Sequence, residues 1–361
     1  MSKRLLWLFF LLLMVLAACS SQDEQVQIES NDGADVTENT SQEEGEGTEQ
    51  NQDEASAGYN VFPLTGKRTD KPVNQRVIAV MVNNHSSARP QTGLTKADVV
   101  YEVLAEGSIT RFLALFHSEQ PDVIGPVRSA REYYVKLAQS HEALFVYHGA
   151  ATHIENQMNG WIDHLNGTYY DNNGTLFQRV NFRSPPHNSY LQWDGIEDTA
   201  TSKGISTRMN HDSLPFLNEE DVKAIKGDSA ATVRITYSST PQEIVEYQFN
   251  EGTGQYTRWN DGVQTVDYET NEPMLLENVF IVEANHKVID GAGRRAVDLE
   301  SGGNGYLIQQ GQVQEVQWRN KEGRIVPYQD GEPTGFVPGK TWVNIVPENP
   351  GINQSVSISA Q

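Results

Sequence analysis

Cysteine is almost absent from this sequence, since Cys19 is the only one among 361 residues. The folded part of the chain therefore has no disulfide, no thiolate nucleophile and no metal bound by cysteine. The sequence also lacks an apolar run of the roughly 20 residues that a membrane-spanning helix needs. The run from Leu5 to Ala18 has only 14 residues. The chain must fold by burial, and the residues after its N-terminal part are enough for two domains.

Basic residues are scarce as well: Lys and Arg number 27 against 48 Asp and Glu, and the net charge is −21. Residues 20–58 contain 12 acidic residues and no Lys or Arg. Without Lys3 and Arg4 the charge is −23, and without those 12 acidic groups it is −11 for residues 59–361. Nucleic-acid binding needs a basic surface, so we expect no nucleic-acid partner.

The N-terminus has the form of an export signal. Lys3 and Arg4 precede the apolar run, which closes with Leu16-Ala17-Ala18-Cys19. This ending resembles the lipobox of bacterial lipoproteins, which implies cleavage of a signal peptide (residues 1–18) and a diacylglyceryl thioether on Cys19. Two acyl chains give stable anchoring in a lipid bilayer. We expect a lipid-anchored protein on the extracytoplasmic face of the cell membrane; an uncleaved anchor or an ordinary secretory signal is the alternative.

Composition divides the rest of the chain into four segments. Residues 19–58 are acidic and have almost nothing to bury, so we expect a disordered tether that could extend on the order of 130 Å. An N-terminal domain (residues 59–214) and a C-terminal domain (residues 215–349) follow. Residues 350–361 form a tail.

The N-terminal domain mixes strand and helix patterns. Apolar runs at residues 77–82, 99–106 and 109–117 predict strands. Helical patterns predict helices at residues 129–141, 153–159 and 190–203. This mixture indicates an α/β (or α+β) domain.

The C-terminal domain reads as β-rich, because short strand patterns recur about every 8–12 residues between turn signals. The predicted strands are residues 233–237, 243–249, 255–259, 263–268, 278–284, 296–299, 305–309, 313–318 and 341–346. Trp259, Trp318 and Trp342 lie on or beside these strands, where they either pack in the core or line a binding surface.

A hairpin is the most informative local pattern. Gly107-Ser108 predicts a two-residue type II′ turn between two strands. With that turn, Arg111 lies diagonally opposite both Glu102 and Glu106, within reach of their side chains. The cluster is either a structural ion-pair network or a site in which Arg111 binds an anion and the carboxylates act as acid, base or hydroxyl acceptor.

Two further arginines stand at a predicted helix start, in Gly125-Pro126-Val127-Arg128-Ser129-Ala130-Arg131. Positive charge is unfavourable at a helix N-terminus, so Arg128 and Arg131 are better explained if an anion joins them. That anion is either a ligand or the protein's own Glu102 or Glu106. The Gly-Lys-Ser/Thr ending of a nucleotide-binding loop is missing.

Polar residues follow the predicted strands and occupy a proline-rich loop. Ligands in α/β sheets gather beyond the carboxyl ends of strands, which makes these residues candidates for binding. They are Asn83, Asn84, His148, His187 and Asn188. No His-Glu-x-x-His or comparable spacing is present, and we expect neither a metal site nor a cofactor.

Several motifs together resemble the YerB family of bacterial lipoproteins. They are Ala79-Val80-Met81-Val82-Asn83-Asn84-His85, Ala88-Arg89-Pro90-Gln91-Thr92-Gly93-Leu94, residues 97–107, Thr110-Arg111-Phe112, residues 125–131, Pro186-His187-Asn188 and Gly339-Lys340-Thr341-Trp342. The resemblance implies a two-domain protein on the outer face of the membrane, mainly in Gram-positive bacteria. It assigns no activity, because the family has no known function.

Two functions follow as hypotheses. In the first, the protein binds an anionic cell-wall polymer or a membrane-bound wall protein through the Arg/Glu cluster. In the second, it hydrolyses an envelope polysaccharide, with Glu106 and Glu102 as the catalytic pair and Arg111, Arg128 and Arg131 binding an anion. A transporter's solute-binding protein fits less well, because such proteins have two similar α/β lobes. An open cleft containing these residues would support a site, and a sealed network would not.

Overall fold

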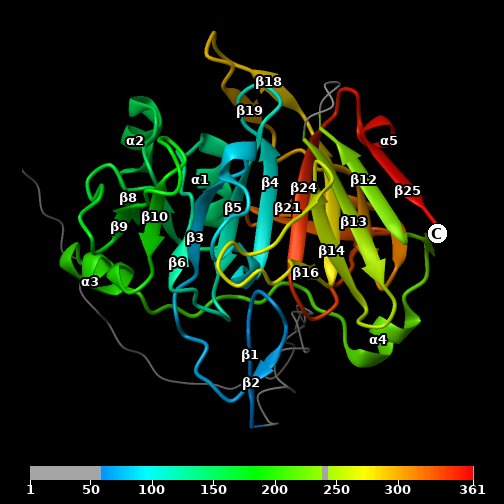
Figure 1. Cartoon of the computed structure of the whole chain (residues 1–361). Helices are drawn as coiled ribbons and strands as arrows, with labels where there is room; N and C mark the ends of the chain where they lie inside the picture. The colour runs from blue at the N-terminus through cyan, green and yellow to red at the C-terminus, as the bar shows by residue number, and fades with distance from the viewer. Residues whose placement is uncertain (1–57, 238–242, 361) are drawn as a thin grey trace, which may run out of the picture. The chain divides into compact units, whose positions relative to one another are not determined.

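A computed structural model describes residues 58–237 and 243–360, which belong to one compact unit. Its main feature is a 12-stranded mixed sheet in the order β23-β22-β21-β20-β17-β24-β4-β5-β3-β7-β8, with β11 joined to β21 (Figure 1). Its strands are β3 (Ile78–Asn83), β4 (Val99–Leu104), β5 (Thr110–Phe116), β7 (Leu144–Tyr147), β8 (His164–Asn166), β11 (Asp228–Ser229), β17 (Asn278–Ala284), β20 (Gly303–Gln309), β21 (Gln312–Lys321), β22 (Arg324–Gln329), β23 (Glu332–Pro333) and β24 (Thr341–Pro347).

The main run of strands with a common direction consists of β17, β24, β4, β3, β7 and β8. The pairs β17–β24, β24–β4, β3–β7 and β7–β8 are parallel, and β5 lies antiparallel between β4 and β3. The ends of β17, β24, β4, β3, β7 and β8 therefore meet at one edge of the sheet, which we call the carboxyl edge. Such edges are where α/β proteins place their ligand sites.

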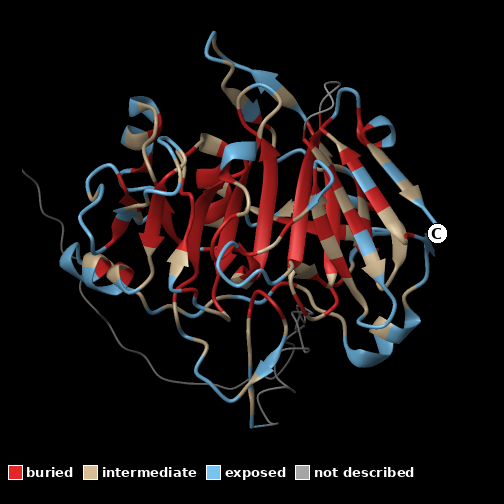
Figure 2. Cartoon of the chain, in the orientation of Figure 1, coloured by how far each residue is buried: buried red, intermediate tan, exposed pale blue. Residues whose placement is uncertain are grey.

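Each face of the central sheet is covered by a different layer, so the sheet lies at the centre of the buried residues (Figure 2). A six-stranded sheet covers one face, where Val100 and Trp342 share a core with Val233 and Tyr247. Helix α1 covers the other face, where Tyr101 packs with Tyr134. The covering sheet consists of β12 (Thr232–Thr236), β13 (Ile244–Asn250), β14 (Gln255–Asn260), β15 (Val263–Gln264), β16 (Leu275–Leu276) and β25 (Val356–Ser359).

The helices are short and few. They are α1 (Glu132–Ser140), α2 (Thr152–Met158), α3 (Gly195–Ser202), α4 (Glu219–Ala224) and α5 (Ile352–Ser355), with 3-10 turns at Ser86–Ala88 and Leu94–Lys96. The predicted helices at 129–141 and 153–159 are confirmed within a few residues. The helix predicted at 190–203 begins only at Gly195, because Ser189–Gln192 (β10) pairs with β6 (Val123–Ile124) and β9 (Phe177–Arg179). Two small hairpins, β1 (Asn60–Val61)–β2 (Arg68–Thr69) and β18 (His286–Val288)–β19 (Arg295–Val297), complete the fold.

The predicted fold class is correct for the C-terminal region, which is built from strands, and correct in part for the N-terminal region. That region has the parallel strands and helices of an α/β domain, but its strands belong to a sheet shared with the rest of the chain. Strand β24, from the predicted C-terminal domain, lies between β17 and β4. Residues on both sides of the predicted boundary at 214/215 therefore form one sheet.

The β4–β5 hairpin corrects one prediction. The predicted turn forms, and the Ile109 N–H donates to the Glu106 carbonyl across it. However, Ala105 and not Glu106 donates to the Ile109 carbonyl, so the register is shifted by one residue. Because neighbouring side chains on a strand point to opposite faces, Glu102 and Arg111 lie on opposite faces of the sheet.

The predicted signal peptide, the lipidation of Cys19 and nearly all of the acidic tether lie outside the described residues. Within the described part of the chain, no helix is long and apolar enough to span a membrane.

Candidate functional site

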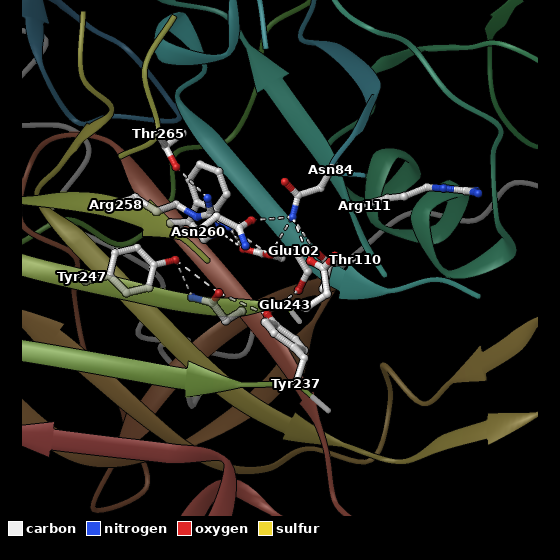
Figure 3. Close-up of polar contacts among 12 residues, drawn as sticks. Asn84, Glu102, Thr110, Arg111, Tyr237, Glu243, Tyr247, Arg258, Asn260 and Thr265 are labelled. Atoms are coloured by element: carbon white, nitrogen blue, oxygen red, sulfur yellow. Dashed lines mark hydrogen bonds and ion pairs between the residues drawn. The ribbon is translucent and has the colours of Figure 1, made fainter. Parts of the chain in front are cut away.

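A buried polar network lies between the central sheet and the six-stranded sheet (Figure 3). Glu102 on β4 and Arg258 on β14 are 0% and 1% exposed, and the Arg258 Nη2 lies 2.8 Å from Glu102 Oε2. Trp342 on β24 donates its indole N–H to the same oxygen at 2.9 Å. The Arg258 guanidinium also lies 4.4 Å from the centre of the Trp342 ring. The charge of Glu102 is thus compensated inside the protein.

Amides and a second carboxylate extend the network. The Asn84 Nδ2 donates to Thr110 Oγ1 at 2.7 Å and to Asn260 Oδ1 at 2.9 Å, and the Thr110 hydroxyl donates to Glu102. Glu243 lies beside them. Burial raises the pKa of Glu243 to about 7; Arg89 opposes this shift, while the negative charge of Glu102 adds to it.

This network overturns the prediction for Glu102 and Asn84. Both side chains are 0% exposed and fully engaged, so no ligand reaches them. Figure 3 also shows Arg111 pointing away from the network. Glu102 and Glu106 therefore cannot act as a catalytic pair, and the hydrolase hypothesis that depended on them fails.

The other carboxylate, Glu106, lies between two arginines near the carboxyl edge. Arg111 Nη2 donates to its Oε2 at 2.9 Å, and Arg131 Nε donates to its Oε1 at 2.5 Å. The Glu106 side chain is 29% exposed, so this cluster reaches solvent. Burial, with the nearby charge of Arg131, lowers the pKa of Arg111 to about 10. Of the two arginines predicted to share an anion at this helix start, Arg131 is thus joined by the protein's own Glu106, whereas Arg128 is not.

Arg128 is the arginine for which Glu106 provides no hydrogen bond. Its Nε is buried and has no hydrogen-bond partner among the described residues. Burial and the charge of Arg131 both lower its pKa. Arg111, Arg128 and Arg131 thus carry three positive charges, against the single negative charge of Glu106.

Backbone contacts fix Arg128 at the carboxyl edge. Its N–H donates to the Met81 carbonyl on β3, and its carbonyl accepts from the His148 N–H after β7. The Ser189 carbonyl accepts from the residue before Arg128. Gly125 allows the approach to β10, since a Cβ there would lie 2.6 Å from the Tyr190 ring. The segment thus bridges the ends of two parallel strands.

Two histidines flank Arg128. Asn83 Nδ2 lies 2.8 Å from His187 Nδ1, and because an amide nitrogen only donates, the His187 proton is on Nε2. The His187 ring stacks on that of His85 at 4.7 Å. His148 Nδ1 lies 2.7 Å from Ser189 Oγ. Each ring is thus held in place by neighbouring side chains.

The electrostatics of these histidines depend on Arg128. Burial lowers the pKa of His187, and the charges of His85 and Arg128 lower it further. Burial also lowers the pKa of His148, against a raising effect of Asp171. Both rings are therefore neutral at pH 7.

Asn188, a further candidate for binding, has a structural contact instead: its Oδ1 accepts a hydrogen bond from Arg179 at 2.7 Å.

We call Arg128, Arg131, Arg111, His148 and His187 the Arg128 site. Two surface pockets of about 430 and 480 Å³ are lined by other residues. In residues 58–237 and 243–360, no group of three or more His, Cys, Asp or Glu side chains is placed to bind a metal ion.

Sequence reasoning missed the residues that complete the buried network. In β14 the buried side chains are Tyr256, Arg258 and Asn260, which alternate with half-buried Thr257 and Trp259. The apolar residue Trp259 suggests that the face of β14 carrying Thr257 and Trp259 is the buried one, whereas the structure buries the face with Arg258. Nothing local indicates that a strand buries an arginine.

Comparison with known proteins identifies the family. Residues 64–206 match the N-terminal domain, and residues 233–343 the C-terminal domain, of a family described as "Protein of unknown function (DUF3048)". The "Putative lipoprotein YerB" of Bacillus subtilis (strain 168) is 47% identical over 289 residues, which cover 79% of this chain and 86% of that protein. Its name is consistent with an envelope lipoprotein.

A solved structure agrees with the fold. The crystal structure of the YerB protein from Bacillus subtilis matches with a TM-score of 0.77 and 46% identity, covering 83% of this chain and 100% of that one. The resemblance to YerB inferred from the motifs is thereby confirmed. The chain belongs to the two-domain DUF3048 family.

Proposed function

We propose that this chain is a lipid-anchored protein of the cell envelope whose Arg128 site binds an anionic group of a cell-wall polymer. The buried, unpartnered Nε of Arg128 is the observation that carries the proposal. A buried donor without a partner costs about 1–3 kcal/mol, and such groups in native proteins call for an explanation.

A bound anion accounts for both the unpartnered Nε of Arg128 and the charge of the site, whereas a bound water molecule accounts only for the first. A water could accept from Arg128 Nε, but it would leave the excess positive charge of Arg111, Arg128 and Arg131 uncompensated. A phosphate or carboxylate oxygen would satisfy both, because guanidinium groups bind such anions through charged hydrogen bonds. The Nε2–H of His187 is a further donor beside Arg128.

The position of the site suits a ligand beyond the membrane. The Arg128 site lies at the carboxyl edge, whereas the loop after β1 lies at the opposite edge, where the Thr65 carbonyl accepts from Gly339 N–H just before β24. A tether ending near residue 58 would therefore join the fold away from the site (Figure 1). The name of the Bacillus subtilis relative supports an envelope location.

Sedimentation with purified Gram-positive cell walls tests the proposal. We expect the full chain, purified in detergent, to bind intact walls and to lose binding after hydrofluoric acid removes phosphodiester-linked polymers. Arg128→Gln should weaken binding about 10–100-fold, the value of a charged hydrogen bond. Arg208→Gln, which changes an exposed arginine elsewhere, serves as the matched control.

The outcomes separate the alternatives. Binding equal for wild type and Arg128→Gln would refute the proposal. Binding that survives the acid but still requires Arg128 would assign the anion to a carboxylate, of wall peptide or of a wall-bound protein.

A further inference from the structure

The larger of the two surface pockets, of about 480 Å³, opens on the outer surface where α5 meets β20, β21 and β22. Its volume falls in the range of small-molecule sites. The polar side chains that line it include Asn304, Tyr306, Glu315, Gln317, Tyr328 and Asn353.

The strand register brings these side chains onto one face. Tyr306 on β20 pairs with Glu315 on β21, and Asn304 pairs with Gln317. Gln317 in turn pairs with Tyr328 on β22. Neighbouring strands are about 4.8 Å apart, so amide, carboxylate and phenol groups alternate across the floor at a regular spacing.

Part of this lining is held in place by its own hydrogen bonds. Gln317 Nε2 donates to Asn304 Oδ1 at 3.0 Å, and Asn304 Nδ2 donates to Glu283. The Tyr306 hydroxyl donates to Asn353 Oδ1 at 2.9 Å. These contacts orient the side chains before any ligand arrives, which reduces the entropy lost on binding.

Two polar groups of the pocket lining remain available to bind a ligand. Neither the Glu315 carboxylate nor the Tyr328 hydroxyl makes a hydrogen bond within the described residues. The Arg319 guanidinium lies over one face of the Tyr328 ring, 4.4 Å from its centre. The pocket therefore offers free acceptors and donors beside two tyrosine rings.

The chemistry of the lining selects the class of ligand. Glu315 and Asp330 line the pocket, and no lysine or arginine is among its lining residues; Arg319 lies at its margin, over the Tyr328 ring. The net charge of the lining is therefore negative, which disfavours a phosphate or carboxylate. An apolar ligand would leave the amides and carboxylates without partners, at about 1–3 kcal/mol for each buried group. A molecule rich in hydroxyl groups, with an apolar ring face for tyrosine, satisfies both conditions. We propose that this pocket binds an uncharged saccharide, independently of the Arg128 site.

Ligand-observed NMR on the full chain in detergent tests this proposal, with chitotetraose and maltotetraose as uncharged probes. We expect at least one to bind with a millimolar or lower Kd. Gln317→Ala and Tyr328→Ala should each weaken binding at least about fivefold, a loss of about 1 kcal/mol. Matched changes at exposed residues elsewhere, Gln248→Ala and Tyr169→Ala, should leave binding unchanged.

Two results would overturn the saccharide site: neither probe binds, or both pocket variants bind as the wild type does. Melting temperatures of all variants should match that of the wild type, since the altered side chains are at least partly exposed. Arg128→Gln should leave saccharide binding unchanged, so failure here and failure of the anion site are distinguishable.

Discussion

Replacing Arg258 by leucine should destabilise the protein strongly. The change removes two hydrogen bonds, of 3.0 and 2.8 Å, to Glu102. Glu102 keeps the Trp342 and Thr110 donors. However, its side chain is 0% exposed, so water cannot solvate the carboxylate once the positive charge of Arg258 is gone. Breaking one partner of a buried pair costs about 3–5 kcal/mol. The melting temperature should fall on the order of 10 °C.

Urea unfolding of the full chain, followed by tryptophan fluorescence, measures this loss. Arg234→Leu is the matched control, because Arg234 on β12 pairs with Glu246 on β13 at 2.7 Å but is 46% exposed. Exposed pairs contribute only about 0–1 kcal/mol. The large difference between the two variants follows mainly from the burial of the Arg258–Glu102 pair.

The double variant Glu102→Leu/Arg258→Leu completes the test. Removing both charges leaves no unpaired charge inside, so the double variant should lose less than the sum of the two single losses, by at least about 1 kcal/mol. The reasoning is refuted if Arg258→Leu costs no more than Arg234→Leu, or if the single losses simply add.

Three further predictions concern charge. The folded pKa of Glu243, about 7, lies above the ordinary 4.5, so the folded state binds more protons between these pH values and its stability falls as pH rises through them. Stability curves should show a loss of up to about 3 kcal/mol between pH 4.5 and 8 in the wild type relative to Glu243→Gln, and parallel curves would contradict the assignment. Glu106→Gln should tighten anion binding to cell walls, because it removes the carboxylate that competes for Arg111 and Arg131; weaker binding would mean that Glu106 contacts the ligand directly. Wall binding should strengthen as pH falls below 6.5, where His148 and His187 gain protons, and a pH titration of His148→Gln/His187→Gln should be flatter than that of the wild type.

Much of the fold was predictable because local patterns are strong. Residues 278–284 form the predicted strand without a change of boundary, and the strand at 341–346 gains one residue. The pairing of that last strand with β4 was not predictable, since the paired residues are about 240 positions apart. Local periodicity specifies a strand but not its distant neighbour.

The β4–β5 hairpin shows why the strand register could not be predicted from the sequence. Every residue of β4 and β5 is buried, so apolar side chains occur on both faces. Alternation then cannot choose between two registers that share the same turn. This one-residue shift separated Glu102 from Arg111, whereas the arginines at the start of α1 were found from the unfavourable placement of their charge.

The resonance of the Arg128 Nε–H group tests the central claim most directly. In a ¹⁵N-labelled full chain, this signal can be assigned by its absence from Arg128→Gln. On addition of a soluble, phosphodiester-bearing wall polymer, we predict that it shifts saturably and that the Arg208 signal does not. Saturable binding of the polymer with an unchanged Arg128 signal would contradict the account.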